Sequence, residues 1–234
     1  MEITPIGTVR TCFGDKFAVP RQPVLCPSSW GELTFYEGFR DPSMVRELSE
    51  FSHLWLIFGF HATAGQGWSP TVRPPRLGGN KRVGVFATRS TFRPNGLGLS
   101  LVKLEGIEYG QDGPLLKLGR LDLIDGTPIF DIKPYLPFTD ALPDAAAGFA
   151  DTLPSEVPVS VNADALGAFE ALPLRARALI LECLSQDPRP AVQVDREEKL
   201  YGARLCGQEV RFCFGEEGCE ILSISPEAGS GLNC

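Results

Sequence analysis

Alternation of apolar and polar residues along the first half of the chain indicates short β-strands. Four segments show it over strand length: residues 3–10, 31–36, 99–109 and 115–124. Residues 53–61 (HLWLIFGFH) form a nearly continuous apolar run, which predicts a central buried strand, and residues 83–88 (VGVFAT) predict another. Glycine and proline cluster between these segments. Short strands separated in this way are typical of a barrel or a strongly curved sheet rather than of alternating β-α units.

Prolines limit where helices can form. Residues 20–23 (PRQP) cannot lie inside a helix, because two prolines fix φ and remove N–H donors, so we expect an extended loop there. Residues 41–48 predict a short helix with Asp41 as N-cap and Pro42 at the first helical position. Residues 163–184 have helical spacing, but Pro173 must divide them into two helices or one broken helix.

A change in composition after Pro137 predicts a second structural unit. Residues 140–158 are rich in alanine, proline and acidic residues, which is typical of a linker. Residues 201–224 contain two alternating stretches joined by Gly-Glu-Glu-Gly, which predict a hairpin. We therefore expect a mainly β protein, with a β-barrel-like N-terminal domain at residues 1–150 and a small α+β C-terminal domain at residues 151–234.

Composition indicates where the protein is expected to act and whether it is expected to bind a metal. No basic, apolar leader opens the chain, and no apolar run approaches the roughly 18 residues of a membrane helix. The seven cysteines form no Cys-x-x-Cys pair, so reduced thiols in the cytoplasm are expected. With two histidines and no ligand spacing among the cysteines, we expect no metal site.

Charge is distributed very unevenly. The chain has a net charge of −7, yet residues 51–104 contain no Asp or Glu. This window therefore carries +7 and the rest of the chain −14. Such asymmetry indicates a polyanion site on an otherwise acidic protein, although a solvated basic face would give the same pattern. Its basic residues are Arg73, Arg76, Lys81, Arg82, Arg89, Arg93 and Lys103.

Polar, turn-forming segments between the strands are the candidate binding loops. There are four: residues 20–23, 73–82, 89–100 and 125–137. The arginines of residues 89–100 suit carboxylate or phosphate, but this segment matches neither the phosphate-loop nor the dinucleotide pattern. Asp125-Gly126-Thr127-Pro128 is a turn sequence, and His61 precedes a loop of small residues. No Ser/His/Asp order or metal cluster is present, so hydrolase and metalloenzyme chemistry find no support.

Five motifs, taken together, resemble those of the TrmO/TsaA-like family, and the resemblance covers nearly the whole chain. The motifs are FAVPRQP (17–23), FSHLW (51–55), FRPN (92–95), LDLIDGTPIFDIKPYLP (121–137) and QDPRP (186–190). Members of this family are tRNA N6-methyltransferases acting on threonylcarbamoyladenosine at position 37. One departure is visible, because the family commonly reads RPNPIG where this chain has RPNGLG at residues 93–98. Loss of that proline should loosen the loop around Asn95.

The resemblance implies a β-barrel methyltransferase that works as a homodimer with S-adenosylmethionine on the anticodon loop of tRNA. Asp125 is the best candidate for orienting the cofactor, and the resemblance assigns no catalytic residue. The implied cofactor-binding residues are Arg21, Gln22, His61, Ala62, Arg89, Leu99, Asp125, Gly126, Thr127 and Pro128. The implied RNA-binding residues are Arg73, Arg76, Lys81, Arg82 and Arg93.

Two other functions remain open at this stage. The basic window at residues 51–104 could belong to a non-catalytic module that binds RNA or a nucleotide. Its arginines could instead hold the carboxylate or phosphate of a small metabolite in a cofactor-dependent enzyme. If the methyltransferase expectation holds, the methyl group is transferred in line, and the protein contributes mainly alignment and desolvation.

Overall fold

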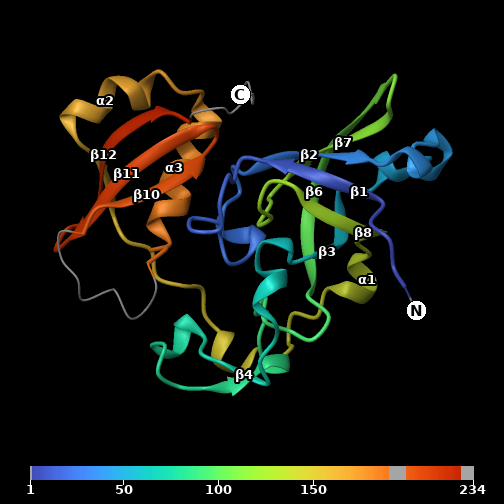
Figure 1. Cartoon of the computed structure of the whole chain (residues 1–234), viewed down its shortest axis with the longest axis horizontal. Coiled ribbons are helices and arrows are strands. Elements are labelled where there is room, and N and C mark those ends of the chain that lie inside the picture. Colours follow the sequence, from blue (N-terminus) through green and yellow to red (C-terminus); the bar gives the residue numbers. More distant parts are fainter. Residues whose placement is uncertain (1, 190–198, 228–234) are drawn as a thin grey trace.

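The computed structural model describes residues 2–189 and 199–227, and the N-terminal part of the chain forms a closed β-barrel (Figure 1). The strand order around the barrel is β1-β2-β7-β6-β3-β8, and each neighbouring pair is antiparallel. This confirms the mainly β fold with a barrel. The barrel strands are β1 (Gly7–Thr11), β2 (Trp30–Phe35), β3 (His53–Gly59), β6 (Leu97–Gly110), β7 (Gly113–Gly119) and β8 (Thr127–Pro134).

Apolar side chains fill the interior of the barrel, because alternate residues of each strand point inward. On β3, Leu54, Leu56 and Phe58 are buried, whereas the residues between them are only partly buried. The apolar run at residues 53–61 is therefore a central strand with one buried face. The expectation of a central buried strand holds for the inner face alone, since only that face of a barrel strand lies in the core, and the strand ends at Gly59.

Residues 125–137 begin with a turn sequence, but most of them form strand β8. The expectation of a loop there is wrong beyond the turn, because β8 pairs with both β1 and β3 and closes the barrel. The strand expected at residues 83–88 is also wrong for most of its length. Its first two residues, Val83–Gly84, form β5, which pairs with β4 (Thr71–Val72), and the chain then turns into a 3₁₀ helix.

Short 3₁₀ helices make up most of the helical structure around the barrel. The helix expected at residues 41–48 begins as predicted, with the Asp41 side chain accepting a hydrogen bond from the Ser43 N–H at 2.8 Å. It ends at Val45, however, and is of the 3₁₀ type. The 3₁₀ segments are Pro23–Leu25, Glu37–Phe39, Pro42–Val45, Leu48–Glu50, His61–Gln66, Pro75–Leu77, Val85–Ala87 and Gly148–Ala150.

The C-terminal part of the chain is a four-stranded sheet with two helices (Figure 1). Its strand order is β10-β11-β12-β9, and β9 runs parallel to β12. The expected hairpin at the Gly-Glu-Glu-Gly turn is confirmed, because β11 and β12 pair there in antiparallel orientation. The first of the two expected stretches is itself two strands, β10 and β11, because Cys206 and Gly207 both adopt positive φ and form an additional turn. The strands are β9 (Val159–Val161), β10 (Tyr201–Leu205), β11 (Gln208–Gly215) and β12 (Gly218–Pro226).

Pro173 determines where the helices of this part end and begin. The expected division at Pro173 is confirmed, since the segment forms α2 (Ala163–Glu170) and α3 (Leu174–Ser185), and Pro173 is the N-cap of α3. A third helix, α1 (Pro137–Asp140), follows the barrel, and largely exposed residues then connect it to β9. No helix of residues 2–189 and 199–227 is long and apolar enough to cross a membrane.

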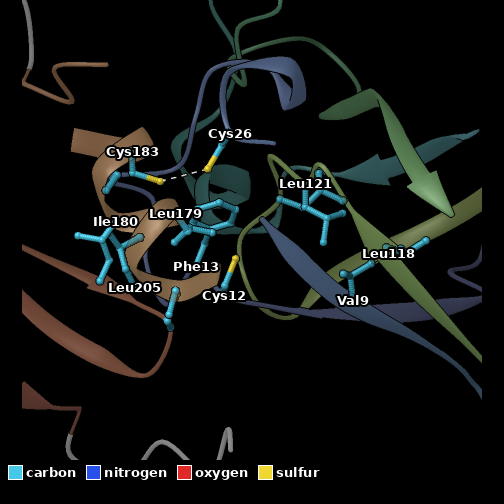
Figure 2. Close-up of a cluster of buried hydrophobic side chains, with 14 of the residues drawn as sticks. Val9, Cys12, Phe13, Cys26, Leu118, Leu121, Leu179, Ile180, Cys183 and Leu205 are labelled. Atoms are coloured by element: carbon cyan, nitrogen blue, oxygen red, sulfur yellow. Dashed lines mark hydrogen bonds between the residues drawn. The ribbon is translucent and has the colours of Figure 1, made fainter. Parts of the chain in front are cut away.

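Residues 12–29 connect β1 to β2 and pack against the C-terminal sheet and α3. Phe13 is fully buried and forms a β-bridge with Leu205 at the end of β10. The Sγ atoms of Cys26 and Cys183 are 3.5 Å apart, and Leu179 and Ile180 of α3 face the same cluster (Figure 2). The barrel and the C-terminal sheet are thus joined through one apolar core.

Candidate cofactor and RNA site

One end of the barrel gathers most of the residues expected to bind a cofactor. In the antiparallel barrel, β1 and β3 finish at the same end at which β6 and β8 begin, as the pairs Val9↔Thr127 and Gly59↔Leu97 show. We call this end the rim. Residues 60–96, which we call the excursion, leave β3 and return to β6 at the rim. The expected binding residues therefore come from the rim strands, the excursion and the loop at residues 20–23.

A hydrogen-bond network connects the loop at residues 20–23 to the excursion. The Arg89 guanidinium donates to Gln22 Oε1, and the Gln22 amide donates to the Arg21 carbonyl oxygen. Arg21 and Arg89 are both exposed, so their guanidinium groups remain accessible to a ligand. The structure thus brings together three expected cofactor-binding residues that are separated by up to 68 positions in the sequence.

The turn at residues 125–128 joins the end of β1 to the start of β8. Asp125 Oδ1 accepts a hydrogen bond from the Thr11 N–H at 2.8 Å, and the Gly126 N–H donates to the Val9 carbonyl oxygen at 2.9 Å. The Thr127 hydroxyl is turned back to the Ile124 carbonyl oxygen at 2.6 Å. Much of this turn's hydrogen-bonding capacity is therefore used to hold the rim together.

His61 and Ala62 lie at the start of the excursion, in an exposed 3₁₀ helix. The Phe60 N–H donates to the Gly96 carbonyl oxygen at 2.8 Å, which places this helix beside the start of β6. Leu99 lies on β6 with 54% of its surface exposed, although a leucine in a barrel strand usually packs against a neighbour. These residues add an imidazole and an apolar surface to the rim.

Asp122 is a rim residue that the sequence analysis missed. It lies in the loop after β7, between the buried Leu121 and Leu123, and its Oδ1 accepts a hydrogen bond from the Ser100 hydroxyl at 2.5 Å. Burial raises the pKa of the Asp122 carboxyl to about 6, while the Ser100 hydrogen bond and the Arg89 charge act in the opposite direction. A polar residue between two core leucines was the available signal, because it implies a carboxylate turned away from the core.

The basic residues of the excursion fall into two groups. The Arg82 guanidinium donates to Thr71 Oγ1 at 2.8 Å, and the Arg93 guanidinium donates to the Thr88 carbonyl oxygen at 3.3 Å. Both therefore support the fold of the excursion. In the part of the chain that the structure describes, Arg73, Arg76 and Lys81 are exposed and have no hydrogen bond or ion pair. Their charges are available to an external anion.

The end of α3 approaches the loop at residues 20–23. Partial desolvation lowers the pKa of the Arg21 guanidinium, while Asp187 and Arg76 are close enough to shift it in opposite directions. Arg21 also lines an open pocket of about 30 Å³ that Cys183 and Gln186 border. Small-molecule pockets usually measure about 300–1,000 Å³, so this pocket alone cannot hold a nucleoside cofactor. Pro190, the last residue of the QDPRP motif, lies outside the described residues.

The groups at the rim fit S-adenosylmethionine chemically. The Arg89 guanidinium is suited to a carboxylate, and the exposed Leu99 offers apolar contact to a base. Among residues 2–189 and 199–227, no group of three or more His, Cys, Asp or Glu side chains could hold a metal ion. Fold and rim together define a β-barrel protein whose rim presents guanidinium, imidazole and apolar groups beside a basic excursion.

Comparison with known proteins places the chain more narrowly. Residues 8–141 match the tRNA-methyltransferase O N-terminal domain, and residues 154–227 match the TrmO C-terminal domain. The chain is 49% identical to the tRNA (adenine(37)-N6)-methyltransferase of Escherichia coli, over 94% of this chain and 96% of that protein. It is 45% identical to a putative S-adenosylmethionine-dependent methyltransferase of Pseudomonas aeruginosa, over 90% and 91% of the two chains.

A solved structure agrees with these sequence matches. The crystal structure of TrmO from Pseudomonas aeruginosa superposes with a TM-score of 0.78 and 37% identity, over 97% of each chain. The chain therefore belongs to the tRNA-methyltransferase O family, and the resemblance noted from the five motifs is confirmed.

Proposed function

We propose that this protein transfers the methyl group of S-adenosylmethionine to N6 of threonylcarbamoyladenosine at position 37 of tRNA. The coarser activity, S-adenosylmethionine-dependent N6-methylation of a tRNA adenine, carries over from full-length relatives whose names state it. The proposal adds to this activity that the methylated adenine carries a threonylcarbamoyl group. The observation that supports the assignment is that Arg89, which is bonded to Gln22 and acts on Asp122, lies near the barrel end where Leu99 and residues 125–128 begin their strands.

Within this proposal, the rim binds S-adenosylmethionine, which supplies an electrophilic methyl group. Arg89 and Arg21 hold its carboxylate, while Leu99 and the 3₁₀ helix of His61 and Ala62 form the wall for its base. Gln22 fixes the orientation of Arg89. Asp125 orients the cofactor with the oxygen that does not accept from Thr11, and residues 126–128 offer backbone groups beside it.

The excursion is the tRNA-binding surface in this proposal. Arg73, Arg76 and Lys81 contact phosphates of the anticodon loop directly, whereas Arg82 and Arg93 hold the excursion in shape and add to its positive field. The excursion joins the rim at both of its ends, so RNA bound along it leads toward the methyl donor.

Three further features complete the proposal. The protein acts as a homodimer in the cytoplasm, where its tRNA substrate is found. Residues 1–150 form the S-adenosylmethionine-binding methyltransferase domain and residues 151–234 the small α+β domain. The matched ranges 8–141 and 154–227 support this division, and the exposure of Arg21, Arg89 and Leu99 in the single chain supports a second subunit that completes the cofactor site.

A methyl-transfer assay tests the proposed function. Purified protein is incubated with labelled S-adenosylmethionine and either tRNA carrying threonylcarbamoyladenosine or the same tRNA with unmodified adenine, and the nucleosides are separated by mass. We expect the label on N6 of the modified nucleoside, with the unmodified tRNA left unlabelled. Equal labelling of both tRNAs would remove the threonylcarbamoyl specificity from the proposal, and labelling of neither would overturn it.

The competing functions give different results in the same preparation. A non-catalytic RNA-binding module would bind tRNA with steep salt dependence but show no heat of binding with S-adenosylmethionine. An enzyme acting on a small anionic metabolite would bind S-adenosylmethionine, and bulk tRNA would not compete with its substrate.

A further inference from the structure

Asp122 lies at the rim, and the proposed function assigns it no role in binding S-adenosylmethionine or tRNA. Its position is fixed on both sides, because the Leu121 carbonyl oxygen accepts from the Ser29 hydroxyl at 3.0 Å and the Leu123 carbonyl oxygen accepts from the Thr11 hydroxyl at 2.9 Å. The leucine side chains fill the core on either side. The carboxylate of Asp122 is consequently held on a rigid support, as a group that reacts must be.

The two oxygens of this carboxylate differ in availability. Oδ1 accepts from Ser100, whose side chain is buried at the start of β6 next to Leu99. Oδ2 has no hydrogen bond to any other residue that the structure describes, although the N–H of Asp122 itself also acts on the carboxylate, and Asp122 as a whole is partly accessible to solvent. Arg89 acts on the carboxylate from the excursion, and Ser100 acts on it from β6. One oxygen is therefore anchored while the other is free to meet a ligand at the rim.

We propose that Asp122 accepts the N6 proton of the tRNA substrate during methyl transfer, with Ser100 anchoring Oδ1 and Oδ2 receiving the proton. This inference rests on the proposed function, since it concerns the base for that reaction. As N6 forms its bond to the methyl carbon, the carbon–sulfur bond breaks and its electron pair stays on sulfur. N6 becomes strongly acidic at that point, its proton moves to Oδ2, and the resulting carboxylic acid later releases it to water.

The carboxyl chemistry agrees with this role. A general base must be deprotonated at working pH, yet basic enough to accept a proton in the transition state. Burial raises the pKa of Asp122 to about 6, which leaves the group ionised at neutral pH and more basic than an ordinary aspartate. Asp122 is hydrogen bonded to Ser100 and lies within the field of Arg89, whereas Asp125, the other carboxylate of this loop, accepts from the Thr11 N–H.

The test is the pH profile of kcat/KM for methyl transfer to tRNA carrying threonylcarbamoyladenosine, in wild-type protein, Asp122→Asn and Ser100→Ala. The wild-type value should rise with pH and level off above about pH 6, since kcat/KM reports the free enzyme. Asp122→Asn should lose on the order of 100-fold and lose this acidic limb. Ser100→Ala removes a hydrogen bond that lowers the pKa, so its limb should move to higher pH.

Two measurements separate this role from a structural one. Calorimetric affinity for S-adenosylmethionine should stay within about threefold in Asp122→Asn, because asparagine can still accept from Ser100 through its carbonyl oxygen. NMR titration of ¹³C-labelled aspartate carboxyls should show a signal that titrates near pH 6 in wild-type protein and is missing in Asp122→Asn. The matched control is Asp112→Asn at the exposed β6–β7 turn, which should behave like wild type.

The outcomes distinguish this inference from the proposed function. An active wild-type protein whose Asp122→Asn variant keeps both its rate and its acidic limb would overturn the role of Asp122 alone. A wild-type protein that leaves the modified tRNA unmethylated would overturn the proposed function and this inference with it. If Asp122→Asn does not fold, Ser100→Ala still tests the role. A pH profile of kcat/KM in which its acidic limb lies at the wild-type pH would count against Asp122 as the base.

Discussion

At the scale of single residues, Asp125 shows that a side chain expected to bind a ligand can also stabilise the fold. Asp125 lies in a turn sequence within one of the family motifs, and the resemblance made it the candidate for orienting the cofactor. Its Oδ1 nevertheless accepts from the Thr11 N–H at the last residue of β1. Its orienting role remains a proposal that concerns its other oxygen.

This bond predicts a stability difference between two variants. Asp125→Ala leaves the partly buried Thr11 N–H without an acceptor, which costs about 1–3 kcal/mol. Thermal unfolding should then occur roughly 2–4 °C lower for each kcal/mol in a chain of this size. Asp125→Asn keeps an acceptor and should unfold within about 1 °C of wild type by the same scaling. Identical unfolding temperatures for all three proteins would contradict the structural role.

Gly96 explains how the departure from the family pattern is accommodated. Its φ is +59°, which proline cannot adopt, so the turn at residues 93–96 differs locally from one built on RPNP. The Gly96 N–H donates to the Arg93 carbonyl oxygen at 3.1 Å, and the Gly96 carbonyl oxygen accepts from Phe60. Hydrogen bonds thus close the turn in the described structure, where the family commonly uses proline.

At the scale of elements, strands with strong alternation were predictable and the irregular excursion was not. The segments that became β2 and β6 alternate clearly, because one face of each lines the barrel. β8 was missed because its first residues are a turn sequence. In addition, its pairing depends on β1 and β3, which are distant from it in the sequence. Residues 83–88 have strand composition, but only Val83 and Gly84 find a partner.

The candidate site was predictable in its members but not in their contacts. Motif resemblance identified Gln22 and Arg89, yet no local pattern indicates that they form a hydrogen bond across the site. Asp122 was missed for the same reason, because its significance depends on Ser100 and Arg89, which only the folded barrel brings close.

The division of the excursion's basic residues predicts their separate effects on tRNA binding. Replacing Arg73, Arg76 and Lys81 by alanine should weaken binding and flatten the plot of log K against log salt by about 2–3, since each phosphate contact contributes roughly 0.7–0.9. The melting temperature should not change, because these side chains hold no other described residue. Replacing Arg10, Lys16 and Arg46, which are equally exposed on other elements, is the matched control. An unchanged slope would remove these residues from the tRNA surface.

At the scale of the whole molecule, the excursion carries an exposed aromatic patch. We define the patch as Trp68, Phe86 and Phe92, whose segments are hydrogen bonded through Ser69 to Phe92 and through Val85 to Pro70. Trp68 is 59% exposed and Phe86 78%. Neighbouring apolar side chains exposed to this degree mark interaction surfaces, and aromatic residues are enriched at subunit interfaces.

The proposed homodimer makes this patch the subunit interface, and the prediction can be tested by mass and by ligand affinity together. Light scattering on wild-type protein should give twice the chain mass of 25.4 kDa. Trp68→Glu with Phe86→Glu places two charges in the buried patch and should give the single chain mass. Leu166→Glu with Leu174→Glu, on α2 and α3, makes the same change at exposed apolar residues away from the rim and should remain dimeric.

The same variants show whether the cofactor site depends on the second subunit. Arg21, His61, Arg89 and Leu99 are exposed in the single chain, so a partner's surface over the rim would enclose the cofactor. Monomers produced by Trp68→Glu with Phe86→Glu should therefore bind S-adenosylmethionine at least about tenfold more weakly, a loss of about 1.4 kcal/mol. Monomers that bind with wild-type affinity would show that one chain completes the site. A wild-type protein of single-chain mass would contradict the dimer itself.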